Sequence, residues 1–278
     1  MKEKKSKGRP FLEIFASSLQ EDYRFPLLEF FAFLYALGTF VFANISVGFT
    51  GVGGLEESSV YGLVSSLMSL PLFIFMILIF KNIAYGLGSD LEKGTIQTIF
   101  SYPLKRYAIL TAKLLSAIGA ALLVLFGIQV FALLVLAPDM ILPYMAVVLA
   151  TYLASLSYPL LLASIILLVT LLIRKGGLAI VIGIVLFFAG SIFQSLAIFL
   201  AMVSRSPLLL QILSVVNPSI AMQYHYYNLS VFVGENLNGE TIWAPTFTEV
   251  LVYIGAGYAL VIAVLLLSYY FFSRRLNL

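Results

Sequence analysis

Few side chains in this sequence could carry out catalytic chemistry. The 278 residues include no cysteine and a single histidine, His225, which stands beside Tyr224 and Tyr226. Because metal sites need several ligands, a lone histidine among tyrosines indicates an interfacial side chain. The absence of cysteine excludes disulfides, thiol catalysis and cysteine-ligated zinc or iron–sulfur clusters. We therefore expect no catalytic residue, no metal site and no enzyme activity in this chain.

The sequence also lacks a phosphate-binding loop. The stretch from Gly86 to Thr95 contains glycines, but no lysine followed by serine or threonine after a second glycine, which a P-loop requires. One carboxylate, Glu29, falls inside an apolar stretch, near its start, where it can be solvated or paired with Arg24. Since carboxylates inside a membrane mark ion paths, their scarcity argues against a carrier driven by protons or sodium ions. We expect the chain to bind no cofactor of its own.

The composition requires that most of the chain avoid water. It is 62% hydrophobic and 10% charged, with a mean hydropathy of +1.05, as is typical of integral membrane proteins. A hydrocarbon core about 30 Å thick needs roughly 20 apolar residues per helix, and alternating barrel strands are absent. The predicted fold is an all-α membrane bundle, one domain over residues 1–278, with six transmembrane helices: Leu27 to Phe49, Tyr61 to Phe80, Ala108 to Leu136, Tyr144 to Ile173, Leu178 to Val203 and Val250 to Phe272.

The basic residues assign an orientation to these spans. If the chain starts inside, all 16 Lys and Arg residues except Arg205 fall on the cytoplasmic side, as the positive-inside bias requires. An inverted or five-span arrangement would put the basic tail or the Arg174–Lys175 turn outside. The sequence thus predicts a multi-pass protein of the cell membrane with both termini cytoplasmic. Charge sorted in this way makes a nucleic-acid partner a poor explanation for the lysines.

The segments outside the spans are expected to form short helices. Residues 1–25 hold a basic tail and an amphipathic stretch that is either an interfacial helix or a disordered tail. Residues 204–249, on the outer side, are too long for a simple loop. Within them, Leu208 to Val216 and Ile220 to Val233 fit two short extracellular helices. The sequon that begins at Asn228 makes this residue a candidate glycosylation site.

The longest polar cytoplasmic segment between two spans comprises residues 82–106. Ser89, with Glu92 three residues later, forms a capping box that can start a short helix. Alternatively Thr95 is the cap, because Gly94 weakens a helix interior. Either start gives a cytoplasmic helix between the second and third spans.

This helix is predicted to be amphipathic and to end at Pro103. Ile96, Ile99 and Phe100 share one apolar side, and the intervening polar residues face away. A helix of this kind lies parallel to the membrane surface. It can touch both the bundle and a cytoplasmic partner.

The segment resembles a motif of the type 2 ATP-binding-cassette (ABC) permease family. In that family a glutamate, a Gly-Thr pair, an apolar helix, a Pro-x-x-Arg element and a later lysine lie between the second and third spans. The resemblance extends over essentially the whole chain, including the interfacial helix, the short helices before the last span and the basic end. The matching residues here are Glu92, Gly94, Thr95, Pro103, Arg106 and Lys113.

The resemblance implies the transmembrane permease subunit of an ATP-driven exporter. In the family the cytoplasmic segment is a coupling helix, seated in a groove of a separate nucleotide-binding ATPase subunit that binds ATP and Mg. This chain would then work in the membrane lipid without an ATPase of its own. The implied contact residues for the ATPase are Glu92, Gly94, Thr95, Ile96, Ile99, Phe100, Pro103 and Arg106.

The resemblance also implies a second permease, either another copy or a paralogue. The translocation path in relatives lies between two permeases, with walls mainly from the second and fifth spans. Mild polarity there suits an amphipathic or lipid-like cargo, although serines also bond their own helix in membranes. The candidate path residues are Ser65, Ser66, Ser69, Ser191, Gln194 and Ser195.

Other function classes share some of these features. A non-transport scaffold or assembly subunit of a larger complex also needs only spans and a docking surface. A secondary carrier would work on an ion gradient without ATP, and an intramembrane enzyme would need a nucleophile–base pair that no span contains. The sequence leaves the cargo and the choice between homodimer and heterodimer open.

Overall fold

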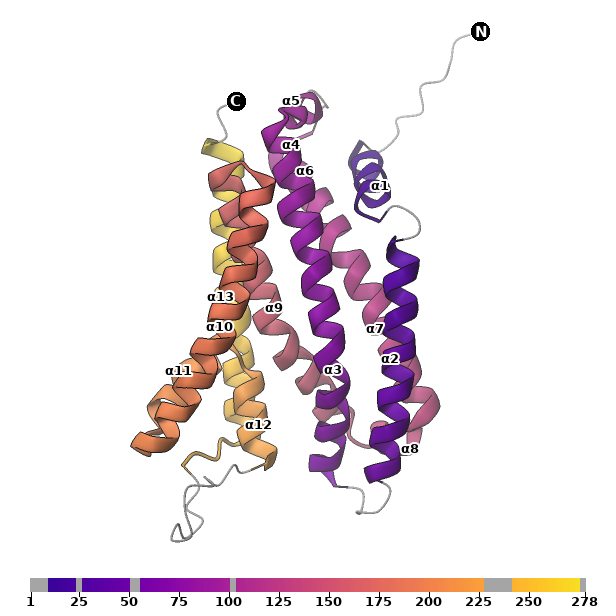
Figure 1. Ribbon diagram of the computed structural model, residues 1–278, viewed down its shortest axis with the longest axis vertical. Coiled ribbons are helices and arrows are strands. Elements are labelled where there is room, and N and C mark those ends of the chain that lie inside the picture. The colour runs from indigo at the N-terminus through magenta and orange to yellow at the C-terminus, as the bar shows by residue number, and fades with distance from the viewer. Residues whose placement is uncertain (1–9, 24–26, 51–55, 101–103, 228–241, 276–278) are drawn as a thin grey trace.

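The computed structural model describes residues 10–23, 27–50, 56–100, 104–227 and 242–275. These residues are almost wholly helical and contain no strand, and the long helices run side by side in one elongated bundle (Figure 1). Five helices are long and apolar enough to cross a membrane, which confirms the membrane-protein class. They cover Glu57–Glu92, Arg106–Leu136, Met145–Ile173, Gly176–Ser204 and Phe247–Arg274.

Helix α2 (Leu27–Thr50) occupies the position of the first predicted span. It contacts α3 (Glu57–Ile79) and α7 (Ala120–Leu136) along the bundle. Among the residues whose side chains are described, its apolar run extends over Ala32–Val41. Helix α2 therefore lies in the bundle beside α3 and α7 (Figure 1).

Three of the long helices include a π-helical turn. Helix α3 continues through η1 (Phe80–Leu87) into α4 (Gly88–Glu92), so no helix begins at Ser89 and the capping box expected there is wrong. The wider π turn keeps the chain helical while shifting the register of its side chains. The other two composite helices are α6 (Arg106–Leu114), η2 (Leu115–Gly119) and α7, and α13 (Phe247–Tyr270) with η3 (Phe271–Arg275).

The core of the bundle lies around α3 and α9 (Met145–Ile173). In the most apolar window of α3 with its extension, 67% of the residues are buried within the chain, against 17% for α10 (Gly176–Ser204). Leu78, Ile83 and Ile166 are among the fully buried side chains at this centre. Helix α10 instead exposes apolar side chains, which therefore face lipid or another chain.

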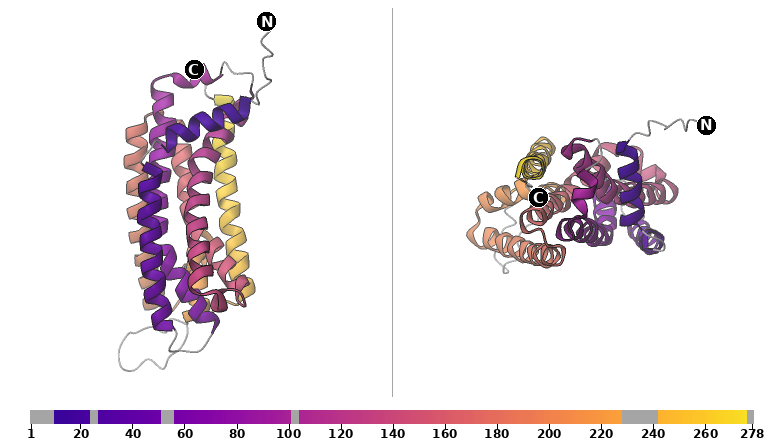
Figure 2. Two further views of the ribbon diagram at one scale, coloured as in Figure 1. Left: turned by 90° about the vertical axis from the view of Figure 1, so that its right-hand side faces the viewer. Right: turned by 90° about the horizontal axis from the view of Figure 1, so that it is seen from above.

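The short helices gather at the two ends of the bundle. Helix α1 (Pro10–Asp22), α4, α5 (Thr95–Phe100) and η3 lie at one end, here called the α5 end (Figures 1 and 2). At the opposite end, the α12 end, lie α8 (Pro138–Ile141), α11 (Pro207–Val216) and α12 (Ser219–Tyr227). The helical character of α11 and α12 is as predicted, whereas Asn228 lies outside the described residues.

Helix α1 crosses the α5 end at a steep angle to the long helices (Figure 2). Ile14, Ser18 and Asp22 are buried at a spacing of four residues, which places them on one helix face. Ile14 packs with Ile109 and Ala112 of α6. The amphipathic stretch near the N-terminus is therefore a docked helix.

Candidate functional site

The α4–α5 turn lies at the α5 end of the bundle and carries the segment that the sequence singles out. Gly94 adopts φ of 73°, a left-handed conformation that costs little for glycine and more for any residue with a Cβ. This turn ends α4 and lets α5 start at Thr95. The Thr95 hydroxyl donates to Oδ1 of Asp90 at 2.9 Å and to its carbonyl oxygen at 3.2 Å.

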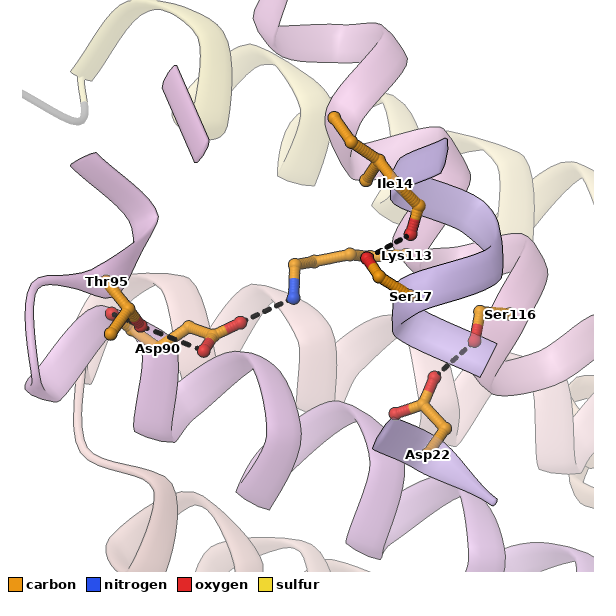
Figure 3. Close-up of polar contacts among 7 residues, drawn as sticks. All are labelled: Ile14, Ser17, Asp22, Asp90, Thr95, Lys113 and Ser116. Carbon is orange, nitrogen blue, oxygen red and sulfur yellow. Dashed lines mark hydrogen bonds and ion pairs between the residues drawn. The ribbon is translucent and has the colours of Figure 1, made fainter. Parts of the chain in front are cut away.

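An ion pair ties the turn to α6. Lys113 Nζ donates to Oδ2 of Asp90, whose other carboxylate oxygen accepts from Thr95 (Figure 3). The two charged side chains are only 12% and 13% exposed, so the pair is partly shielded from water. Lys113 is the later lysine of the sequence motif, and its carboxylate partner in this fold is Asp90.

A second polar contact anchors α1 beside this pair. The Asp22 carboxylate accepts a hydrogen bond from Ser116 in η2 (Figure 3), and Lys81 Nζ donates to the Asp22 carbonyl oxygen. The Tyr23 hydroxyl donates a hydrogen bond to the Ala117 carbonyl oxygen at 2.7 Å. Burial raises the pKa of the Asp22 carboxyl to about 6, against the lowering effect of Ser116, Lys113 and Lys81.

The apolar side of α5 is packed into the bundle. Ile96 is fully buried, and the Phe100 ring meets Phe272 of η3 edge-on with centroids 5.6 Å apart. The Arg106 guanidinium lies 4.8 Å from the centroid of the Phe100 ring, a cation–π distance. Gln97 is exposed on the other side. The amphipathic helix predicted from the sequence is thus present, with one face supported by the bundle and one open.

The residues expected to contact an ATPase differ in exposure. Glu92, Thr95 and Arg106 are exposed, and Gly94 and Phe100 are half-buried. Ile96 points into the bundle and supports the helix from below. Pro103 and the side chain of Ile99 lie outside the described residues.

The candidate path residues are divided between a cavity and an exposed face. Ser65 lines a cavity of about 370 Å³ between α3, α9 and α10. On α10, Ser191 and Ser195 are exposed, and each donates to the carbonyl four residues earlier, at 2.9 and 3.0 Å.

The remaining path residues have other surroundings. Gln194 accepts from Asn217 at 3.0 Å, and Ser66 is exposed and donates to the Leu63 carbonyl at 2.9 Å. The side chain of Ser69 lies outside the described residues.

Sequence reasoning missed the partners that hold the α5 end together. Asp22 and Ser116 are 94 positions apart, and Asp90 and Lys113 are 23 apart, so no local pattern joins them. The only signal in the sequence was the motif lysine, Lys113, because a partly buried lysine requires a carboxylate partner. His225 likewise has a partner outside its own helix, since its Nδ1 lies 2.7 Å from the Pro245 carbonyl oxygen, 20 positions away.

No family model and no curated protein matches this sequence. The resemblance to ABC permeases therefore rests on the motif residues and on the arrangement of the helices.

Proposed function

We propose that this chain is the permease subunit of an ATP-driven exporter, with six spans and both termini in the cytoplasm. Helix α2, 24 residues long, supplies the additional span. Lys81, Lys113 and Arg174 belong to the α5 end, whereas Arg205 follows α10 at the α12 end. This separation supports a cytoplasmic α5 end, because basic residues favour that side.

The observation that carries the proposal is the geometry of α5. A short helix projects at the end of α3 and exposes one polar side, while Ile96 and Phe100 connect its other side to the bundle. A cytoplasmic ATPase that bound the exposed side of α5 could therefore move the bundle helices against which α5 packs.

Three connections would transmit that movement. Through Phe100, α5 contacts η3 at the end of α13, and through Asp90 and Lys113 the turn is joined to α6. Ile96 links it to the core around η1. ATP can change the conformation of this chain only if the ATP-bound and ATP-free forms of the partner bind α5 with different affinity in its two conformations.

The exposed side of α10 supports a second permease. Ser191 and Ser195 lie on the face of α10 that this chain leaves uncovered, next to exposed Ile192 and Phe193. Gly255 on α13 also has open space around it, whereas Gly183 packs against Ile166 within the chain. A path between two copies or paralogues would thus be lined by α10.

The proposal is tested by co-purification from native membranes. The tagged chain is expected to bring down a nucleotide-binding subunit, identified by mass spectrometry, and the complex to hydrolyse ATP. Glu92→Ala, or deletion of residues 94–100, should remove the partner, because exposed Glu92 at the end of α4 and the exposed side of α5 supply the contact. Glu57→Ala, which changes an exposed glutamate at the α12 end, is the matched control and should leave the complex intact.

Two results would contradict the proposal. If the complex contains other membrane proteins but no ATPase, the chain is a scaffold or assembly subunit. If vesicles with the purified chain move a cargo on an ion gradient without ATP, it is a secondary carrier.

A further inference from the structure

The cavity between α3, α9 and α10 divides into a polar and an apolar half. Ser65, Ser155 and Ser219 line it toward the α12 end. Leu72 and Met76 of α3 line it deeper in the bundle, with Leu162 of α9. From Ser65 to Met76 the α3 axis rises about 16 Å at 1.5 Å per residue. The cavity is therefore elongated along the bundle and changes polarity along its length.

None of the described residues that line the cavity carries a charge. Its polar groups are hydroxyls and the amide of Asn217, which already donates to Gln194 and accepts from Ser219. A charged head group would thus find no counter-ion among these residues, and burying it unpaired is strongly unfavourable. The lining favours a neutral ligand.

Hydrogen-bonding capacity is left over on α9. Among the described residues, neither the Ser155 hydroxyl nor the Tyr158 hydroxyl has a hydrogen-bond partner, and both residues line the cavity. Three positions apart, they lie on the same helix face. Pro159 lacks the N–H that would bond the Ser155 carbonyl in a regular helix. These hydroxyls and this carbonyl, together in a membrane bundle, favour a ligand group that both donates and accepts hydrogen bonds.

The cavity is bordered by an aromatic pair. The Phe73 ring, 48% exposed, and the Phe187 ring have centroids 6.3 Å apart and both line the cavity. Phe73 is exposed, whereas the other described residues of the lining are buried or half-buried, so the cavity is most open beside Phe73, between α3 and α10. A ligand would therefore enter sideways from the lipid rather than from water.

We infer that this cavity binds a neutral, hydroxyl-bearing amphiphile with a single acyl chain, such as a monoacylglycerol. The hydroxyl head lies at Ser155 and Tyr158, and the chain runs along α3 toward Met76. A volume of about 370 Å³ is at the lower end of ligand pockets and too small for a two-chain phospholipid. Binding needs neither a second permease nor an ATPase, so it stands separately from the proposed function.

Photo-crosslinking of the full chain in phosphatidylcholine nanodiscs tests this inference. The probe is a monoacylglycerol with a diazirine in its acyl chain. Labelling should be saturable, map to peptides that contain Leu72 to Met76 and Leu162, and fall at least ten-fold with excess unlabelled monoacylglycerol. Palmitate and lysophosphatidylcholine, which carry charges, should compete at least ten-fold more weakly.

Ser155→Leu fills the polar half and should lower the saturable labelling at least five-fold. Ser17→Leu is the matched control, because Ser17 is exposed on α1 at the α5 end, away from the cavity, and donates to the Ile14 carbonyl of its own helix. If Ser155→Leu does not purify as a folded protein, Tyr158→Phe takes its place and should weaken binding by about two- to ten-fold, the worth of one hydrogen bond.

Three results would overturn the inference. Labelling could fail to saturate and spread over the exposed faces of α7 and α10. It could remain unchanged in Ser155→Leu or Tyr158→Phe. Charged amphiphiles could compete as well as the monoacylglycerol does, in which case the ligand class is wrong.

Discussion

Asp22 is the residue at which burial and charge conflict most clearly. It is 8% exposed, receives a hydrogen bond from Ser116 and has Lys81, Lys113 and Glu21 nearby. Burial raises its pKa to about 6 from an ordinary value of 3.8. The folded state therefore binds the proton more tightly than the unfolded state.

The stability of the α5 end should consequently depend on pH. The contribution of the Asp22 proton is fully present below about pH 4 and is lost as the pH rises through about 6. Asp22→Asn should remove this contribution to the pH dependence and raise the free energy of unfolding above pH 7, by about 2–3 kcal/mol at most. Thermal unfolding of both proteins in detergent at pH 5 and 7.5 measures this change in pH dependence. Glu21→Gln, an exposed neighbour, should retain the pH dependence; an unchanged profile in Asp22→Asn would contradict the assignment.

Gly94 controls the turn before α5. An added Cβ would meet nothing within 4 Å, so any effect of Gly94→Ala comes from the φ of 73° alone. We expect a loss of about 1–2 kcal/mol in the local stability of α5. Hydrogen exchange of the α5 amides should become faster in Gly94→Ala and not in Gly127→Ala, whose added Cβ also meets nothing within 4 Å but lies inside α7. Equal exchange in the two variants would contradict this.

At the scale of elements, α4 and the start of α10 approach very closely. A Cβ on Gly88 would lie 2.5 Å from the Cα of Gly176, and backbone cannot move aside as a flexible side chain can. Gly88→Ala should therefore destabilise the protein by about 1–3 kcal/mol, the cost of overpacking. Gly177→Ala, next in the chain with open space around it, should leave the melting temperature nearly unchanged. Equal melting temperatures would show that the helices separate readily.

The local elements were predictable where a local signal decides them. The sequence indicated only that Gly94 weakens a helix interior; in the structure its left-handed backbone separates α4 from α5. The capping box at Ser89 failed because the π-helix η1 carries α3 onward, and Ser89 is inside a helix that tertiary packing extends. Thr95 stands at the start of α5, but its hydroxyl is a donor to Asp90.

At the scale of the whole molecule, hydropathy was sufficient for the long helices. A membrane-spanning helix needs only a run of apolar residues long enough to cross the bilayer. The five helices that are this long and apolar each contain most or all of one predicted span. The polar links and the cavity could not be foreseen, since they depend on how distant helices lie together. Ser65 was singled out for its polarity, whereas Ser155 and Tyr158, on another helix, were not.

The central claim is that a separate ATPase docks on α5, and site-directed cross-linking tests it most directly. The chain has no cysteine of its own, so Gln97→Cys places one thiol on the exposed side of α5. In native membranes a maleimide–diazirine reagent, attached to this thiol and then illuminated, should join α5 to a nucleotide-binding subunit, whichever residues of that subunit lie against it. Thr248→Cys, exposed at the α12 end, should give no such adduct. An adduct with an ATPase from Gln97→Cys alone is the predicted result, and the absence of one, or equal adducts from both variants, would contradict the account.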